Sequence, residues 1–236
     1  MITEPMNAMK TFDQNYATWK GWRTLFKCSQ DDRMYFSGEF QFLPVSGKKI
    51  LEIGFGGGTF LRWAKDEGAQ VSGCELIKEL CDAGSSLGFD TRHGDLSTFA
   101  NELGLFDYIV AFDVLEHISP VDLLPFFQQV HAMLAPSGTF VARVPNAGSP
   151  WGLPYQYGDI THISLLSPGR FQQLAQASKF QLAKCGNAFR IRRQGRKLTD
   201  TIRFFAMDLA ALVFNKLGGF WRLPLDPNIV AVLKKR

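Results

Sequence analysis

A carboxylate and three alternate glycines form the most informative group in the sequence. Glu52, Gly54, Gly56 and Gly58 directly follow the apolar run 50–51. Glycine allows the backbone to adopt positive φ and to approach a ligand closely. The N-terminus of a helix after such a turn offers unpaired N–H groups and a positive dipole end. The pattern therefore predicts a ligand-binding turn between a buried strand and a helix.

Two common phosphate-binding motifs do not fit this turn. A dinucleotide fingerprint, G-x-G-x-x-G/A, would end at Thr59 or Leu61, depending on the first glycine. A P-loop requires Gly-Lys-Ser/Thr, and that tripeptide is absent. The register that fits is Glu-x-Gly-x-Gly-x-Gly, beginning at Glu52.

Two further acids follow the next predicted strands. Glu75 lies 21 residues after Gly54, at the end of the second strand, where a carboxylate can accept both hydroxyls of a ribose. This feature is shared with NAD-binding proteins. Asp95 follows the third predicted strand, and its simplest role is to cap the next helix.

Candidates for proton transfer lie beyond these acids. His162 follows Asp159 by three residues in the segment 147–167, and a histidine with a carboxylate partner can act as a general base toward a sugar or phenol hydroxyl. The alternative is that both residues pin the loop. His117 either orients the acceptor, bridges to a cofactor, or is a structural histidine.

The order of elements explains how these residues come together. Apolar strands alternate with helices from residue 48 to residue 146, which predicts a parallel sheet with helices on both faces and a ligand site at the strand carboxyl ends. Expected strands are 50–53, 70–76, 89–95, 106–112, 139–144, 180–185 and 228–233, and expected helices are 58–66, 77–87, 120–134, 171–177 and 199–217.

We divide the chain into four parts. An N-terminal aromatic helical cap covers 1–46, and the core covers 47–188 with a substrate loop at 147–167. A basic and amphipathic helical insertion covers 189–226, and the last strand of the core covers 227–236.

Taken together, these motifs resemble the class I S-adenosylmethionine (SAM)-dependent methyltransferases. The resemblance implies an α/β, Rossmann-like fold with a seven-stranded, mostly parallel sheet, an antiparallel last strand and helices on both faces. It also implies SAM as the cofactor. A carboxylate at Glu52 suits a ligand with an ammonium and a sulfonium group and would be awkward against a pyrophosphate.

The resemblance also assigns roles to individual residues. It places the glycine turn against the aminoacid part of SAM, Glu75 on the ribose, Asp95 on the adenine amino group and Leu96 beside the ring. The segment 113–118 resembles D-V-L-E-H-V of ubiquinone-type and bacterial glycan O-methyltransferases, which puts His117 near the acceptor. The implied cofactor-binding residues are Glu52, Gly54, Phe55, Gly56, Gly58, Glu75, Leu76, Asp95, Leu96, Asp113 and Leu115.

The acceptor is the least constrained part of the prediction. The stretch 157–162 resembles Asp-x-Thr-His segments of methyltransferases encoded among polysaccharide genes, which favours O-methylation of a bacterial surface glycan or its nucleotide- or lipid-linked precursor. A phenol- or quinone-like small molecule is the alternative, consistent with 13% aromatic residues. A non-catalytic SAM-binding interaction protein is the third interpretation.

Charge is unevenly distributed along the 236 residues. Residues 189–236 hold 11 Lys and Arg against 3 Asp and Glu, whereas 1–188 hold 15 against 19. The segment 190–217 therefore has three interpretations: packing on the core or in a homodimer, contact with an anionic membrane, or contact with nucleic acid. The acidic body argues against nucleic acid.

The remaining composition constrains location and metal binding. The four cysteines form no C-x-x-C pair, so we expect free thiols in a reducing compartment and no metal site. No apolar signal segment and no stretch of about 18 apolar residues occur. We therefore expect a cytoplasmic protein. Peripheral contact with the inner face of the membrane through segment 190–217 is an additional possibility that the basic charge of this segment raises.

Overall fold

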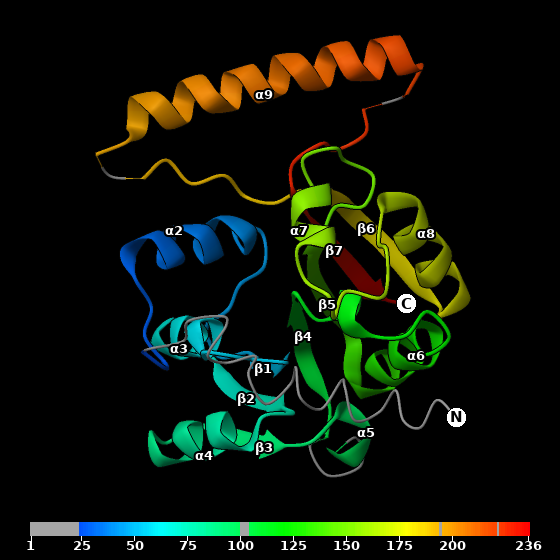
Figure 1. Ribbon diagram of the computed structural model, residues 1–236. Coiled ribbons are helices and arrows are strands. Elements are labelled where there is room, and N and C mark those ends of the chain that lie inside the picture. Colours follow the sequence, from blue (N-terminus) through cyan, green and yellow to red (C-terminus); the bar gives the residue numbers. More distant parts are fainter. Residues whose placement is uncertain (1–23, 100–103, 194, 221) are drawn as a thin grey trace, which may run out of the picture.

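The computed structural model describes residues 24–99, 104–193, 195–220 and 222–236 (Figure 1). Most of the aromatic segment at the start of the predicted cap, residues 1–23, lies outside these ranges. The described part of the cap forms helix α2 (Gln30–Glu39), where Ser29 and Asp32 form a reciprocal capping box.

A single seven-stranded sheet organises the core, in the order β3-β2-β1-β4-β5-β7-β6. β7 runs antiparallel to both neighbours, and the other four strand pairs are parallel, which confirms the predicted mostly parallel sheet with an antiparallel last strand. The strands are β1 (Lys49–Ile53), β2 (Gln70–Glu75), β3 (Asp90–His93), β4 (Phe106–Phe112), β5 (Leu134–Pro145), β6 (Phe180–Asn187) and β7 (Asn228–Lys235).

Helices cover both faces of the sheet (Figure 1). One buried layer includes Phe36 of α2 with Phe60 and Trp63 of α3, whose apolar face has helical spacing. The opposite layer includes Phe127 of α6 and Phe171 of α8. The helices after α2 are α3 (Thr59–Asp66), α4 (Lys78–Ser86), α5 (Leu96–Phe99), the 3-10 turn η1 (Leu115–His117), α6 (Leu123–Met133), α7 (Leu153–Tyr157), α8 (Pro168–Ala177) and α9 (Lys197–Gly218).

The clearest departures from the predicted elements are in β5 and in the loop 147–167. β5 begins at Leu134 rather than at 139, because Leu134 already pairs with Phe106 of β4; the polar residues 135–138, with Ser137 at a φ of 62°, form an irregularity before regular pairing resumes at Thr139. The predicted loop 147–167 contains the short helix α7, which begins after Gly152 with Pro154 in its first turn. Neither difference changes the sheet order or the position of the carboxyl ends of the strands.

The predicted insertion lies between β6 and β7, and α9 within it crosses outside the sheet-and-helix body (Figure 1). In the described part of the chain, all four cysteines are free. Across those same residues, no helix combines the length and apolarity needed to cross a membrane.

Candidate active site

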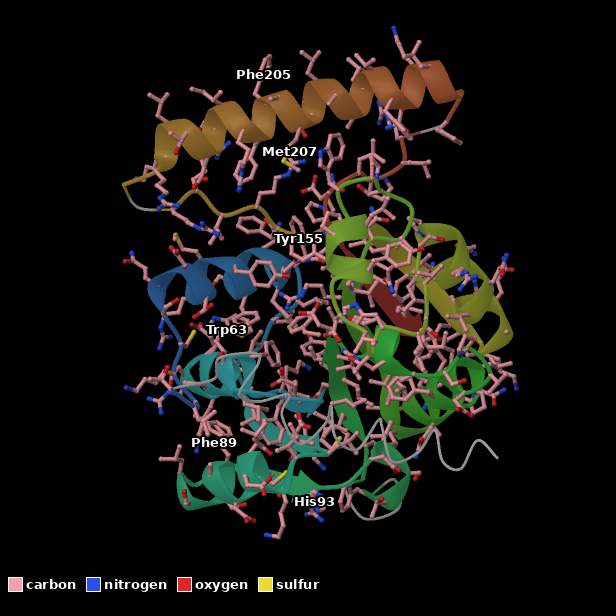
Figure 2. The ribbon with its side chains drawn as sticks, viewed as in Figure 1. Trp63, Phe89, His93, Tyr155, Phe205 and Met207 are labelled. Atoms are coloured by element: carbon pink, nitrogen blue, oxygen red, sulfur yellow. The ribbon has the colours of Figure 1, made fainter. Side chains whose placement is uncertain are left out.

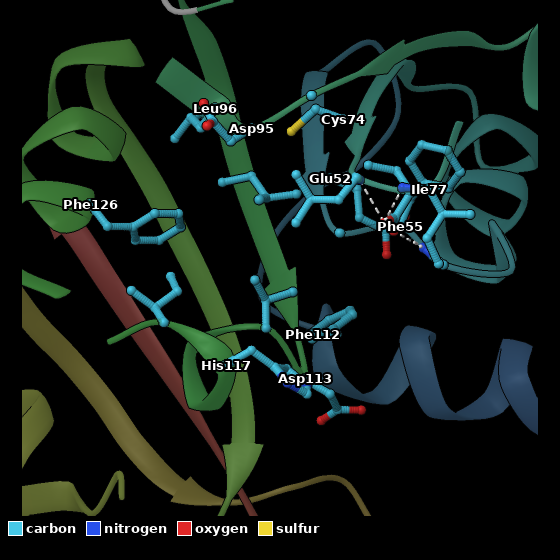
Figure 3. Close-up of a pocket in the computed structure, with 18 of the residues that line it drawn as sticks. Glu52, Phe55, Cys74, Ile77, Asp95, Leu96, Phe112, Asp113, His117 and Phe126 are labelled. Carbon is cyan, nitrogen blue, oxygen red and sulfur yellow. Dashed lines mark hydrogen bonds between the residues drawn. The ribbon is translucent and has the colours of Figure 1, made fainter. Parts of the chain in front are cut away.

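A cavity of about 960 Å³ opens at the carboxyl ends of β1, β2 and β4. This is the edge at which parallel α/β sheets bind their ligands. Figure 3 shows Glu52 and Phe55 on one side of this space, Phe126 on the other, and His117 at one end. Its size lies within the range of small-molecule and cofactor sites, about 300–1,000 Å³.

The glycine turn forms one wall of the cavity. Gly54, Gly56 and Gly58 have φ values of 64°, 50° and 72°, in the left-handed region that other residues rarely adopt. A Cβ at Gly54 would lie 2.6 Å from Val114 Cγ2, so this turn also requires close packing against the segment before η1. Gly54 and Gly56 line the cavity, and Gly58 precedes α3 as its N-cap.

Glu75 connects the end of β2 to this turn. One carboxylate oxygen accepts a hydrogen bond from the Gly56 amide at 3.0 Å, and the other accepts from Leu76 and Ile77 amides at 2.7 and 3.2 Å. A carboxylate has about four acceptor positions, so these three bonds leave capacity for a ligand hydroxyl. Glu75 therefore holds the turn in place while it faces the cavity.

Glu52 is a buried carboxyl group in the cavity wall. Burial raises its pKa well above the ordinary value, although the Leu61 backbone N–H donates to it. Its Oε2 atom has no hydrogen-bond partner among the described residues. A buried acceptor without a partner fits a cationic ligand, because an ammonium or sulfonium group would offset the cost of ionising the carboxyl.

Asp95 and Leu96 follow β3 and line the same cavity as Glu75. The Asp95 carboxylate accepts hydrogen bonds from the Ser97 hydroxyl and from the Ser97 and Thr98 amides, and these bonds lower its pKa. It thus caps α5, as the sequence allowed, while lining the cavity beside Leu96.

Asp113 follows β4 with a φ of 58° and forms a two-point ion pair with Arg143 of β5. Arg143 Nε lies 3.0 Å from Asp113 Oδ1, and its Nη2 lies 2.5 Å from Oδ2. The guanidinium also lies over the rings of Phe112 and Tyr35, at 5.1 and 5.3 Å from their centroids. Arg143 lines the cavity and was not predicted as a site residue.

A hydrogen-bonded chain leads from the loop to His117. Thr161 Oγ1 donates to Asp159 Oδ1 at 2.6 Å and lies 2.9 Å from His117 Nδ1. The single hydroxyl proton is directed at the carboxylate, so the threonine oxygen accepts at the histidine, and Nδ1 carries the ring proton. Nε2 of a neutral His117 then carries the lone pair. His117 and Thr161 both line the cavity.

His162 lies next to these hydrogen-bonded residues but outside the cavity lining, and its side chain is 6% exposed. Its Nε2 atom is 3.5 Å from Asp159 Oδ2 and 4.0 Å from Glu116 Oε1, and its ring centroid is 4.7 Å from that of His117. Glu116, His117 and His162 each present a ligand-type atom, and the three atoms lie within 4.8 Å of one another, so this group could hold a metal ion.

The structure brings most of the predicted site residues to one cavity. Leu115 is instead buried in the core, Gly58 caps α3, and Asp159 and His162 stand one layer behind the wall. The predicted residues that line the cavity are Glu52, Gly54, Phe55, Gly56, Glu75, Leu76, Asp95, Leu96, Asp113 and His117.

The fold and this cavity define a class I SAM-dependent methyltransferase. Residues 23–184 match the model of a family described as a methyltransferase domain. Because the match covers more than half of the chain, the chain belongs to this family. The cofactor of the class is SAM, and the glycine turn, Glu75 and the unpartnered Glu52 oxygen fit it.

Curated relatives and solved structures agree with this placement. The chain is 31% identical over 121 residues to a ubiquinone biosynthesis O-methyltransferase of Bartonella bacilliformis, and 33% identical over 117 residues to that of Bartonella tribocorum. These alignments cover 48% and 47% of each chain, so the chain spans about half the length of the curated relatives it matches.

Two solved structures share the fold. A SAM-dependent methyltransferase from Archaeoglobus fulgidus has a TM-score of 0.64 at 19% identity, covering 86% of this chain and 94% of that one. A second, from Mesorhizobium loti, has a TM-score of 0.58 at 17% identity, covering 86% and 97%.

Proposed function

We propose that the chain methylates a hydroxyl group of a small phenol- or quinone-like acceptor, with SAM as the methyl donor. The observation that carries the proposal is one continuous cavity with two chemically different ends. The polar end contains the glycine turn, Glu52 and Glu75, and the other end contains His117 among apolar side chains.

The acceptor end suits a flat, apolar molecule. It is lined by aromatic and branched side chains, which favour stacking and exclude water. The curated relatives named as ubiquinone biosynthesis O-methyltransferases support the same class of acceptor. The apolar side chains of this part of the lining are Phe36, Phe112, Val114, Ile118, Pro125 and Phe126, and Asp113, Asp122, Gln129 and Arg143 line the cavity as well.

A glycan acceptor has less support. That prediction depended on the stretch 157–162 and on the basic insertion. Asp159 and Thr161 are engaged with His117, inside the protein rather than at its surface. The curated relatives described above are named for ubiquinone biosynthesis, which supports the small-molecule alternative over the glycan.

The chain's own residues have two tasks in this reaction. When bound, SAM supplies a methyl group that is already activated for in-line displacement, so the protein contributes mainly alignment and proton removal. We assign His117 Nε2 as the base that takes the proton of the acceptor hydroxyl. Thr161 and Asp159 hold the ring in the required tautomer, and the Asp159 carboxylate stabilises the imidazolium through the threonine hydroxyl.

Methyl transfer from SAM to a panel of catechols, simple phenols, monosaccharides and sugar nucleotides tests the proposal. We expect methylated product from the catechols or phenols. His117→Gln should lower kcat by about 10²-fold or more and leave SAM affinity unchanged, because general-base removal acts on the chemical step. Thr161→Val should lower kcat less, with recovery in Thr161→Ser.

His162→Gln and His131→Gln are the matched controls. His131 packs against Phe180 and is outside the cavity lining, so its replacement should leave kcat unchanged. A greater loss in His162→Gln than in His117→Gln would transfer the base role to His162. Methylation of the sugars alone would refute the phenolic acceptor.

A further inference from the structure

Helix α9 carries an apolar face that the rest of the described chain leaves exposed. The helix has 22 residues, which corresponds to about 33 Å. Among its described residues, Asp200 and Phe204 are the buried ones. The helix lies beyond residue 184, where the match to the methyltransferase family model ends. None of its residues lines the active-site cavity.

The apolar face points away from the body. Figure 2 shows Phe205 directed outward and Met207 directed toward the body. The outward residues follow the spacing i, i+4, i+7, i+11, which places them on one side of a helix. They are Leu198 at 74% exposure, Ile202 at 59%, Phe205 at 69% and Leu209 at 52%. Leu212 is 57% exposed but lines a small pocket with Cys185 of β6.

The body side of α9 is fixed mainly by polar contacts. Arg190 pairs with Asp208 at 2.7 Å and lies 5.2 Å from the ring centroid of Phe204. Near the other end, the Asn215 side chain donates to the Leu223 carbonyl at 3.2 Å and accepts from the Leu223 amide at 3.1 Å. These contacts orient the helix so that its apolar side stays exposed.

Basic side chains flank the apolar face at both ends. Arg192, Arg193, Arg196 and Lys197 are exposed before or at the start of the helix. Lys216 and Arg222 are exposed near its end. The acidic residues of α9 are outnumbered by these basic side chains, because Asp200 is buried and Asp208 alone is exposed, where it pairs with Arg190.

This distribution of charge distinguishes between two partners for the apolar face of α9, a second copy of the helix and an anionic surface. In an antiparallel pair of α9 helices, the basic segment 192–197 of one copy would oppose Lys216 and Arg222 of the other. In a parallel pair, the two 192–197 segments would oppose each other. Both arrangements place like charges together, whereas an anionic surface complements both ends of the helix.

We propose that the outward face of α9 docks on the surface of an anionic phospholipid bilayer, with the helix lying parallel to that surface. Leu198, Ile202, Phe205 and Leu209 enter the boundary between headgroups and acyl chains, and the arginines contact lipid phosphates. The sheet and its covering helices lie on the side of α9 that faces away from the bilayer. The proposal is independent of the acceptor, because α9 does not line the active-site cavity.

Co-sedimentation of the full chain with lipid vesicles tests this surface. We expect binding to vesicles of phosphatidylcholine mixed with phosphatidylglycerol and little binding to phosphatidylcholine alone. Phe205→Ser combined with Leu209→Ser should weaken binding roughly tenfold or more, because apolar insertion is lost. Arg192→Gln combined with Arg196→Gln should weaken it by roughly 25-fold, at about fivefold for each charge, and raised salt should do the same.

Two control variants remove similar groups elsewhere. Phe42→Ser with Val121→Ser removes side chains that are 87% and 78% exposed, and Lys27→Gln with Lys234→Gln removes two exposed charges. Both controls should bind vesicles like the parent protein. Equal binding to neutral vesicles, or equal loss in the controls, would overturn the proposal. A dimer in solution that Phe205→Ser with Leu209→Ser dissociates, without vesicle binding by the parent, would assign the face to a second copy instead.

Discussion

Glu52 shows how one buried carboxyl links stability to ligand binding. Burial raises its pKa in the folded chain, so it contributes stability that is present at low pH and lost as pH rises through the folded-state pKa. We expect Glu52→Gln to raise Tm of the ligand-free protein at neutral pH by about 2–4 °C, which corresponds to about 1 kcal/mol. The gain should disappear in acid. Calorimetric Tm measurements across pH check this.

The same substitution should weaken cofactor binding, because the carboxylate faces the place where a cation fits. Parent SAM affinity should rise with pH as Glu52 ionises, whereas Glu52→Gln should bind more weakly, with a flatter pH profile. Glu39→Gln is the control, since burial also raises the pKa of Glu39, which contacts Phe189 away from the cavity. Unchanged SAM affinity in Glu52→Gln would contradict the assigned role.

Some site residues could be predicted from the sequence and others could not. Glu75 is the last residue of β2 and Asp95 comes two residues after β3, so their position at the cavity follows from the parallel topology alone. Arg143 carries a weaker signal, a single cation near the end of an apolar strand. Spacing places His117 and His162 in the same region, but which ring faces the cavity depends on Thr161, whose hydrogen bonds no sequence pattern specifies.

At the scale of elements, the glycine turn couples β1 to η1. Gly54→Ala would force a side chain into left-handed backbone at a cost of about 1–2 kcal/mol and would press its Cβ against Val114 at 2.6 Å. We expect lower stability together with weaker SAM binding, measured by urea unfolding and by calorimetric titration. Because Val114 supplies the contact, adding Val114→Ala should recover part of the stability.

Gly47 provides the matched control for backbone strain. It has a φ of 73°, but a Cβ there would meet nothing within 4 Å, and it does not line the cavity. Gly47→Ala should therefore cost only the backbone strain, about 1–2 kcal/mol, and leave SAM affinity unchanged. Equal effects of Gly47→Ala and Gly54→Ala on both measurements would show that the close contact with Val114 is unimportant.

Element prediction succeeded where a periodic pattern was long or strongly apolar. β4 has six buried residues out of seven, and α9 lies within two residues of its predicted bounds. α7 was missed because its five residues contain proline and lie between glycines, a pattern that is typical of a loop. The orientation of α9 could not be predicted either, because spacing defines an apolar face but not the direction in which it points.

At the scale of the whole molecule, the chain forms the edge strand β6 first and returns after the insertion to add β7 beside it. β7 lies between β5 and β6 and is hydrogen-bonded to both, although the insertion separates it from β6 in the sequence. The basic charge of the last quarter therefore belongs to two different parts. Most of it lies in the insertion, and the remainder follows the buried residues of β7.

This topology predicts unequal effects of two deletions. A chain that ends at Pro227 loses β7, including the buried Ile229, Val230 and Leu233, and leaves the facing edges of β5 and β6 unpaired, so we expect it not to fold. A chain in which a flexible Gly-Ser linker replaces 191–222 should keep its cooperative unfolding transition and its SAM binding, because it retains β7 and the Arg190–Asp226 ion pair. Circular dichroism melts and SAM titration compare the two, with deletion of the exposed Arg236 alone as the control. If the linker chain failed to fold while the shortened chain folded, the insertion rather than β7 would be part of the core.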